Sequence, residues 1–109
     1  MGEFIISKRK DGEFQFILQA GNGQTILNSE GYTSKTGCSA GIESVKKNAA
    51  DDKKYDRKKS SNNKAYFNLK AGNGEIIGTS QMYESDQARD HGIDSVKANA
   101  PAASVEDIS

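Results

Sequence analysis

Two glycine-rich stretches have a composition found in phosphate-binding loops. Residues 21–26 read GNGQTI and residues 72–77 read GNGEII. Glycine-rich backbone cradles phosphate when it leads into a helix and carries a lysine and a hydroxyl at set spacing, or forms a complete G-x-G-x-x-G. Neither stretch supplies those elements, and each lies between two strand-like segments. We therefore interpret both as turns, formed by Gly21, Asn22, Gly23, Gly72, Asn73 and Gly74.

A thiol activated by a base is the next possibility, because the chain has one cysteine and one histidine. Cys38 and His91 fall in opposite halves of the chain, and both lie in segments with a helical pattern. We interpret each as an ordinary helix residue. One ligand of each type is also too few for a zinc site of the usual kind.

Paired carboxylates give no stronger signal. The acids that recur at matching positions are Glu43 and Asp94, and each precedes a lysine by three residues. That spacing is typical of a surface ion pair on a helix. We thus predict no catalytic residues, no cofactor and no metal, and a protein that is not an enzyme.

Two basic clusters leave a nucleic-acid interface as the alternative function. If they lay toward one edge or end of a sheet, they would form one patch able to contact phosphates. Interleaved aspartates instead favour a solvated edge strand that resists aggregation. A sheet face that stacks bases needs several aromatic residues, and the pattern leaves only Tyr66 there. The clusters are Lys8, Arg9, Lys10, Arg57, Lys58 and Lys59.

Internal duplication is the strongest signal and explains why the glycine-rich stretch occurs twice. Residues 14–49 and 65–100 align without gaps at an offset of 51, with 17 of 36 positions identical. Two copies are fewer than a repeat array needs for stability. We therefore expect the copies to pair around one shared core, as a fused dimer that is itself a monomer.

Composition agrees with one small domain. The chain has 109 residues, 34% of them hydrophobic, and its 15 basic residues balance its 15 acidic residues. A thin core with one solvated side follows from that low apolar content, and the zero net charge gives no global attraction to nucleic acid or membrane. The longest apolar run near the start is only Phe4–Ile6, too short for a signal peptide or membrane span. A single cysteine fits a reducing compartment, so we predict a cytoplasmic protein.

The spacing of apolar residues predicts the strands and helices of the chain. Alternation from Phe14 to Ala20 indicates a half-buried strand, and residues 24–29 form its hairpin partner. Residues 34–49 switch to a helical period, with Ser34 and Ser85 as N-caps of the two helices. Asn48 and Asn99 would end those helices in the left-handed region. The remaining candidate strands are residues 4–8, 54–58 and 104–108.

Turn chemistry predicts the register of each hairpin. A three-residue loop, Gly21-Asn22-Gly23, places Ala20 opposite Gln24 and Leu18 opposite Ile26, so that both apolar side chains share the core face. The last glycine of the loop then takes a left-handed conformation, which glycine adopts without steric cost.

A serine and a tyrosine recur between each hairpin and its helix. They are Ser29 and Tyr32 in the first copy and Ser80 and Tyr83 in the second. Each phenol is expected to pack its ring and to bond a loop carbonyl, since a buried tyrosine hydroxyl usually finds a partner. The alternative is that these four residues line a small groove, duplicated by the repeat.

Together these motifs resemble the YegP-like family of small bacterial proteins, in its tandem-repeat form. The resemblance rests on F-x-L-x-A-G-N-G-x-x-I, S-x-x-Y and G-I-x-S-V-K-x-N-A, present in both copies, and runs from Phe4 to Ile108. It implies an α+β fold in which two β-β-β-α-β units exchange their last strands and form one antiparallel sheet, with pseudo-two-fold symmetry and both helices on one face.

The resemblance implies no reaction. We expect a single domain over residues 1–109, with repeat one at about 1–52 and repeat two at about 53–109. We expect its function to be binding of an unknown protein or small-molecule partner, with nucleic acid as the alternative.

Overall fold

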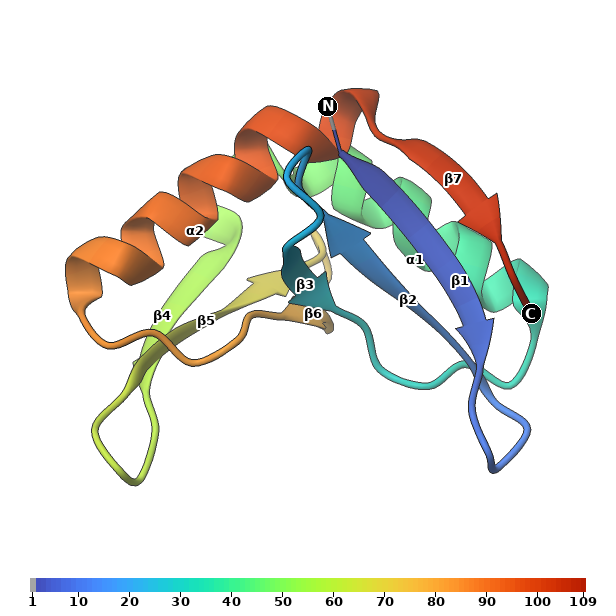
Figure 1. The fold of residues 1–109 in the computed structure, drawn as a ribbon, viewed down its shortest axis with the longest axis horizontal. Coiled ribbons are helices and arrows are strands. Elements are labelled where there is room, and N and C mark those ends of the chain that lie inside the picture. Colours follow the sequence, from blue (N-terminus) through green and yellow to red (C-terminus); the bar gives the residue numbers. More distant parts are fainter. Residues whose placement is uncertain (1) are drawn as a thin grey trace.

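The computed structural model describes residues 2–109 and shows seven strands and two α-helices in that range (Figure 1). Repeat one contains β1 (Glu3–Lys8), β2 (Phe14–Gln19), β3 (Thr25–Asn28) and α1 (Lys35–Asn48). Repeat two contains β4 (Tyr55–Lys59), β5 (Ala65–Lys70), β6 (Ile76–Thr79), α2 (Asp86–Asn99) and β7 (Ser104–Asp107). Short 3₁₀ turns, η1 (Asp52–Lys54) and η2 (Ala100–Ala102), follow the two helices.

The strands form one sheet in the order β4-β5-β6-β3-β2-β1-β7. β3 and β6 meet at its centre, so the two repeats are joined there. β7 crosses from repeat two and pairs with β1 of repeat one. The predicted α+β fold is therefore confirmed, with two differences. β7 runs parallel to β1, whereas the other pairs are antiparallel. The exchange is also one-sided, because among residues 2–109 only β7 crosses to the other repeat and α1 is followed directly by η1 and β4.

Both helices cover the same face of the sheet, and each contacts strands of the two repeats. α1 packs on β2, β5 and β6, and α2 packs on β3 and β5. Aromatic and aliphatic side chains from alternate strand positions fill the space beneath them, among them Phe4, Phe16, Leu18, Phe67 and Leu69, which are completely buried. One core thus serves both repeats, since a single buried cluster contains residues of each.

Helix starts follow the predicted caps. The side chains of Ser34 and Ser85 accept the backbone N–H of the residue three positions later, at 3.0 Å in each case. The predicted left-handed helix ends are wrong, because Asn48 lies within α1 and the C-cap Ala49 has a right-handed φ of −59°. The Asn48 amide instead donates to the Ser44 carbonyl at 2.8 Å, and Asn99 repeats this bond to Ser95 at 2.7 Å.

Each glycine-rich stretch forms a turn in which the second glycine is left-handed, with φ of 84° at Gly23 and 85° at Gly74. The Ala20 N–H donates to the Gln24 carbonyl at 2.9 Å, as the three-residue loop requires. The next step of the predicted register is wrong: Leu18 lies opposite Leu27, because a bulge inserts Ile26 as an extra residue. Both Ile26 and Leu27 are buried, so the bulge directs two successive apolar side chains away from solvent.

An asymmetric pair closes the junction of the repeats. Leu27 on β3 is completely buried, and the residue 51 positions later on β6 is Gly78. A Cβ atom at Gly78 would lie 2.7 Å from Cγ of Leu27 and 2.9 Å from its Cδ1. Since Cβ atoms do not approach other carbons so closely, the junction accommodates one leucine and not two.

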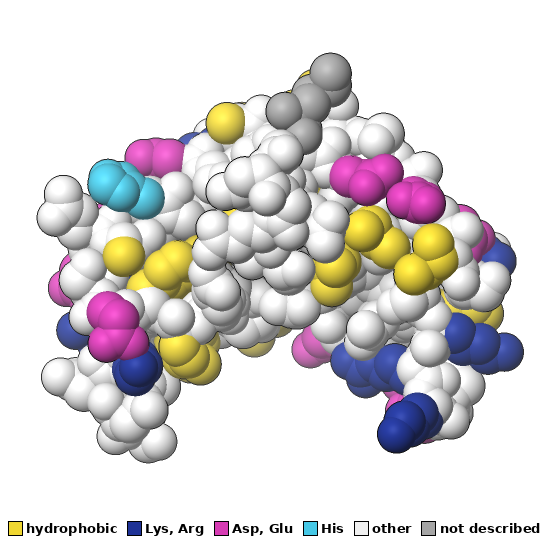
Figure 2. Space-filling view, viewed as in Figure 1, with side chains coloured by type: hydrophobic (Ala, Val, Ile, Leu, Met, Phe, Trp, Pro, Cys, Tyr) yellow, Lys and Arg dark blue, Asp and Glu magenta, His cyan; other side chains and the backbone are white. Residues whose placement is uncertain are grey.

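The whole molecule has the form of an arch (Figure 1). The β1–β2 and β4–β5 hairpins are its two legs; α2 lies along the upper left and α1 lies behind β1 and β2 on the right. The space-filling view shows the hollow between the legs and separate basic groups on each of them (Figure 2).

Candidate ligand pocket between the repeats

A pocket of about 170 Å³ lies where the glycine-rich turn of repeat one faces α2 of repeat two. The wall from α2 is formed by residues spaced as i, i+3, i+4 and i+7, which share one helix face. The opposite wall is the turn and the strand that follows it, and Tyr83 completes the lining. The lining residues are Ala20, Asn22, Gln24, Ile26, Tyr83, Ala88, His91, Gly92 and Ser95.

Tyr83 is fixed in the pocket by its own backbone and by a glycine. Its N–H and C=O form an isolated bridge with Ala65, at 2.7 and 3.0 Å. Its ring lies against the helix at Gly92, where a Cβ atom would be 2.7 Å from Cζ of the ring. Tyr32 and Gly41 repeat this arrangement in repeat one, where the corresponding distance is 2.8 Å. The recurrence of tyrosine and glycine in both repeats therefore has a packing reason.

The predicted hydrogen bond from each phenol to a loop carbonyl is absent among the bonds of residues 2–109. Burial raises the pKa of Tyr83, and a hydrogen bond with Gln81 lowers it in part. Burial likewise raises the pKa of Tyr32, and the charges of Cys38, Glu30 and Glu75 raise it further. Both phenols are therefore protonated at neutral pH and keep a proton to donate.

Ser29 and Ser80 belong to the sheet and not to the pocket lining. The hydroxyl oxygen of Ser80 accepts the Phe67 N–H at 3.0 Å and donates to the Gln81 carbonyl at 2.8 Å. Ser29 makes the same two bonds, with Phe16 and Glu30, at 2.8 Å each. These serines extend the strand ladder just beyond the bulge. Of the four residues predicted to line a groove, the structure places only Tyr83 in this pocket.

Polar groups surround an apolar floor. Ile26 is buried at the base, and His91 lies exposed at the rim. Figure 2 shows this histidine, in cyan, above a patch of hydrophobic surface. Asn22 contributes its side chain to the rim while its Oδ1 accepts the Gln24 N–H at 3.0 Å, which holds the turn. The site can therefore desolvate an apolar group and offer hydrogen bonds around it.

The corresponding surface beside α1 has different chemistry. At an offset of 51, Gln24 becomes Glu75 and His91 becomes Ala40. Ala88 likewise corresponds to Gly37. Three lining residues thus differ between the repeats, whereas the other six, Asn22 among them, have identical counterparts.

Sequence reasoning missed His91, Gln24 and Ala88 as pocket residues. The helical signal was available, because Ala88, His91, Gly92 and Ser95 have the spacing of one helix face. What the sequence did not indicate is that a turn from the other repeat lies over that face. The pocket forms only where the two repeats pack against each other.

Other candidates do not converge on a site. Cys38 is completely buried in α1, where burial raises its pKa, while His91 is exposed on α2. Within residues 2–109, no group of three or more His, Cys, Asp or Glu side chains is arranged to hold a metal ion. No helix in the same range combines the length and apolar character needed to cross a membrane.

The two basic clusters do not form one patch. Lys8 ends β1 and the rest of its cluster lies in the following turn, whereas residues 57–59 lie on β4, at the other end of the sheet. Arg57, Lys58 and Lys59 are each paired with aspartates. The geometry therefore gives no support to the nucleic-acid alternative.

Comparison with known proteins finds a family and solved structures of the same fold. The family model described as "Domain of unknown function (DUF1508)" matches twice, over residues 10–56 and 60–107. A UPF0339 protein in the ptx operon 5′ region of Stutzerimonas stutzeri is 57% identical over 107 residues, which cover 98% of this chain and 96% of that protein.

Two solution NMR structures agree with the fold. A UPF0339 protein from Shewanella oneidensis is 48% identical with a TM-score of 0.93, covering 98% of this chain and 91% of that one. The yegP protein from E. coli, described as of unknown function, is 53% identical with a TM-score of 0.94, covering 98% and 92%. The recognised family is therefore confirmed, and its members carry no described reaction or nucleic-acid partner in these names.

Proposed function

The chain belongs to the DUF1508 family, and from that premise we propose that it is a non-enzymatic binding module that anchors a partner in the pocket between its repeats. One observation carries the proposal. The pocket is the place where a turn of one repeat and a helix of the other meet around the buried Ile26, and three of its lining residues, Gln24, Ala88 and His91, differ from their counterparts in the other repeat.

The volume of the pocket favours one inserted group over a whole cofactor. Sites for small molecules usually enclose about 300–1,000 Å³, whereas this pocket measures about 170 Å³. A cavity of about 150 Å³ is large enough for benzene. We therefore expect a ring-sized apolar side chain of a partner to enter, with its polar edge bonded by the rim.

Residue chemistry supports a binding role over catalysis. His91 is the one titratable ring in the lining besides the phenol, and no thiol or carboxylate lines the pocket with it. A nucleophile with a positioned base is therefore not assembled there among the described residues. A cytoplasmic location is part of the proposal, because Cys38 is a free thiol, as in proteins of reducing compartments.

Titration with defined amino-acid probes tests the proposal. The amide spectrum of the ¹⁵N-labelled protein is followed as N-acetyl-tyrosine amide, N-acetyl-leucine amide or N-acetyl-glycine amide is added. We expect saturable shifts for the first two probes, confined to the amides of the pocket lining, and none for glycine. Shifts scattered over the surface, or none up to the solubility limit, would count against this pocket.

A filled pocket supplies the control. Ala88 is half-buried in the lining, so Ala88→Leu places a larger side chain in the space that the probe needs. Ala98→Leu is the matched variant, because Ala98 is exposed on the same helix and outside the lining. The first variant should abolish the shifts and the second should leave them unchanged.

A further inference from the structure

The sheet has an occupied edge in repeat one and an equivalent unoccupied edge in repeat two. β7 lies along the outer edge of β1, parallel to it. β4 is the counterpart of β1 at an offset of 51, and it ends the sheet on the other side. No strand among residues 2–109 pairs with the outer edge of β4. Two-fold symmetry would place an eighth strand there.

Within residues 2–109, no segment outside the named elements is placed to supply that strand. After α2, residues 100–103 lead to a separate strand, β7. After α1, residues 49–54 lead directly into β4, which is already the first strand of the next hairpin. The segment that follows α1 is therefore a connection into β4, where the segment that follows α2 is an edge strand.

Contacts of β7 show which backbone groups the vacant edge offers. The Ile108 N–H donates to the Ile6 carbonyl at 2.9 Å, and the Ser104 N–H donates to the Gly2 carbonyl at 3.3 Å. The counterpart of Ile6 on β4 is Arg57, so its carbonyl faces the vacant edge. The counterpart of Phe4 is Tyr55, whose N–H is already bonded to the Asp52 carbonyl in η1. The open ladder is therefore short and is centred on Arg57.

Charge at the helix start differs between the two edges. The Asp107 carboxylate of β7 pairs with Lys35, the first residue of α1, at 2.8 Å. The residue that corresponds to Lys35 is Asp86, the first residue of α2. A strand placed on β4 as β7 is placed on β1 would therefore direct its fourth side chain at a carboxylate. A lysine or arginine suits that position, and the aspartate of β7 does not.

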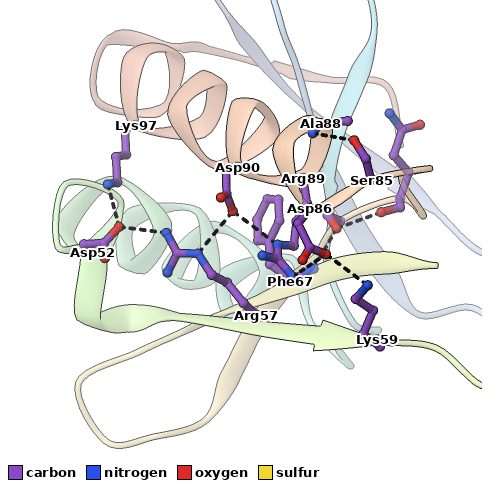
Figure 3. A network of polar contacts seen from close by, with 12 residues as sticks. Asp52, Arg57, Lys59, Phe67, Ser85, Asp86, Ala88, Arg89, Asp90 and Lys97 are labelled. Carbon is purple, nitrogen blue, oxygen red and sulfur yellow. Dashed lines mark hydrogen bonds and ion pairs between the residues drawn. The ribbon is translucent and has the colours of Figure 1, made fainter. Parts of the chain in front are cut away.

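Basic side chains of β4 form ion pairs with carboxylates of η1 and α2 (Figure 3). Arg57 contacts Asp52 at 3.1 Å and Asp90 at 3.3 Å. Asp86 contacts Lys59 at 3.1 Å and Arg89, on its own helix, at 3.6 Å. Their carboxylates are half exposed or more. Pairs of this kind contribute little in water, so a ligand that displaces them loses little.

We propose that the outer edge of β4 binds an extended peptide of a partner protein in parallel orientation, with a lysine or arginine positioned against Asp86. The mode is strand addition, in which backbone hydrogen bonds give affinity and alternate side chains give selectivity. This site is separate from the pocket and does not depend on it.

The strand β7 itself provides the probes. One acetylated and amidated peptide copies residues 103–109, Ala-Ser-Val-Glu-Asp-Ile-Ser, and a second carries lysine at the position of Asp107. Each is titrated into the ¹⁵N-labelled full chain. We expect the lysine peptide to shift the amides of Arg57 and Lys59 and to bind about threefold to tenfold more tightly than the aspartate peptide. The β1 amides should stay unchanged, because the tethered β7 competes there at high effective concentration.

Two controls keep the test sharp. In the intact chain the Ile108 N–H donates to the Ile6 carbonyl of β1. A lysine peptide with N-methyl isoleucine at the position of Ile108 lacks this N–H, so its binding should be lost. Asp86→Lys should reverse the preference between the two peptides, whereas Glu43→Lys, on the exposed face of α1, should not. The proposal is overturned if neither peptide binds, if N-methylation has no effect, if the aspartate peptide is preferred, or if the shifts map to β1 or to the pocket.

Discussion

The leucine-glycine pair at the junction of the repeats should show strong energetic coupling. Gly78→Ala introduces a Cβ atom 2.7 Å from Cγ of the completely buried Leu27. Cγ is the branch point of that side chain, so a small rotation does not relieve the overlap. Overpacking of this kind costs about 1–3 kcal/mol. Leu27→Ala removes the same side chain and should cost about 2–5 kcal/mol through lost burial and a cavity.

The double variant Leu27→Ala/Gly78→Ala tests this coupling. With Leu27→Ala in place, the methyl group of Gly78→Ala enters empty space, and loss of backbone freedom in the unfolded chain should stabilise by about 0.5–1 kcal/mol. Gly78→Ala therefore changes sign between the two backgrounds. The coupling energy from the double-mutant cycle should reach about 2 kcal/mol, well above the few tenths seen for independent sites.

Urea unfolding at equilibrium measures all four proteins, with the m-value checked for constancy. Gly72→Ala is the matched control, because a Cβ atom there has no neighbour within 4 Å and the backbone is not left-handed. It should change the free energy of unfolding by about 1 kcal/mol or less, in the stabilising direction, because alanine reduces the backbone freedom of the unfolded chain. Equal effects of Gly78→Ala in both backgrounds would show that the junction tolerates two side chains, and the packing argument would fail.

Three further outcomes follow from local geometry. Gly41→Ala should lower the melting temperature by about 5 °C or more because its Cβ would overlap the Tyr32 ring, whereas Gly37→Ala should keep or raise it, since Ala88 already occupies the matching place in α2. Gly23→Val and Gly74→Val should each cost about 1 kcal/mol or more in unfolding free energy, because a β-branched residue strains at positive φ, and unchanged melting temperatures in both would refute the turn assignment. A hydrogen bond from Lys35, with others from Ser109, lowers the pKa of Asp107 to about 2. The stabilisation from its charge is therefore complete above the ordinary carboxyl pKa and is lost as the pH falls from that value through about 2. Amide exchange of β7, corrected for intrinsic exchange, should accelerate as the pH falls through this range, and in Asp107→Asn it should not depend on pH there.

Much of the fold was predictable because the sequence states its pattern twice. Alternating apolar residues and a helical stripe recur at one offset, so each copy supports the interpretation of the other. The bulge at Ile26 was not predictable from that pattern, since Ile26 and Leu27 are both apolar and either one could face Leu18. Pairing of Leu18 with Ile26 and pairing of Leu18 with Leu27 would both bury an apolar side chain. The observed pairing, with Leu27, is the one that lets the Ser29 hydroxyl accept the Phe16 N–H beyond the bulge.

The helix ends illustrate a second limit. Asparagine near a helix end suggests left-handed backbone, but Asn48 and Asn99 lie four residues after a serine whose carbonyl they bond. That spacing was visible in the sequence and indicated the correct role. The pocket was harder to predict from the sequence. His91 and Gln24 belong to different repeats, and they lie in one pocket only because the two repeats pack around a shared core.

Identity between the repeats is explained by folding, and that changes where function should be sought. Ser80 completes a strand ladder, Tyr83 packs on Gly92, and Asn99 closes the last turn of α2, each with an identical counterpart in repeat one. Positions that the duplication has kept equal are therefore those that either repeat needs in order to fold. Function specific to the fused chain has to reside where the halves differ, because only there can the two sides recognise different groups. The rim at His91 and the unoccupied edge of β4 are both such places, and neither would be selected by looking for what recurs.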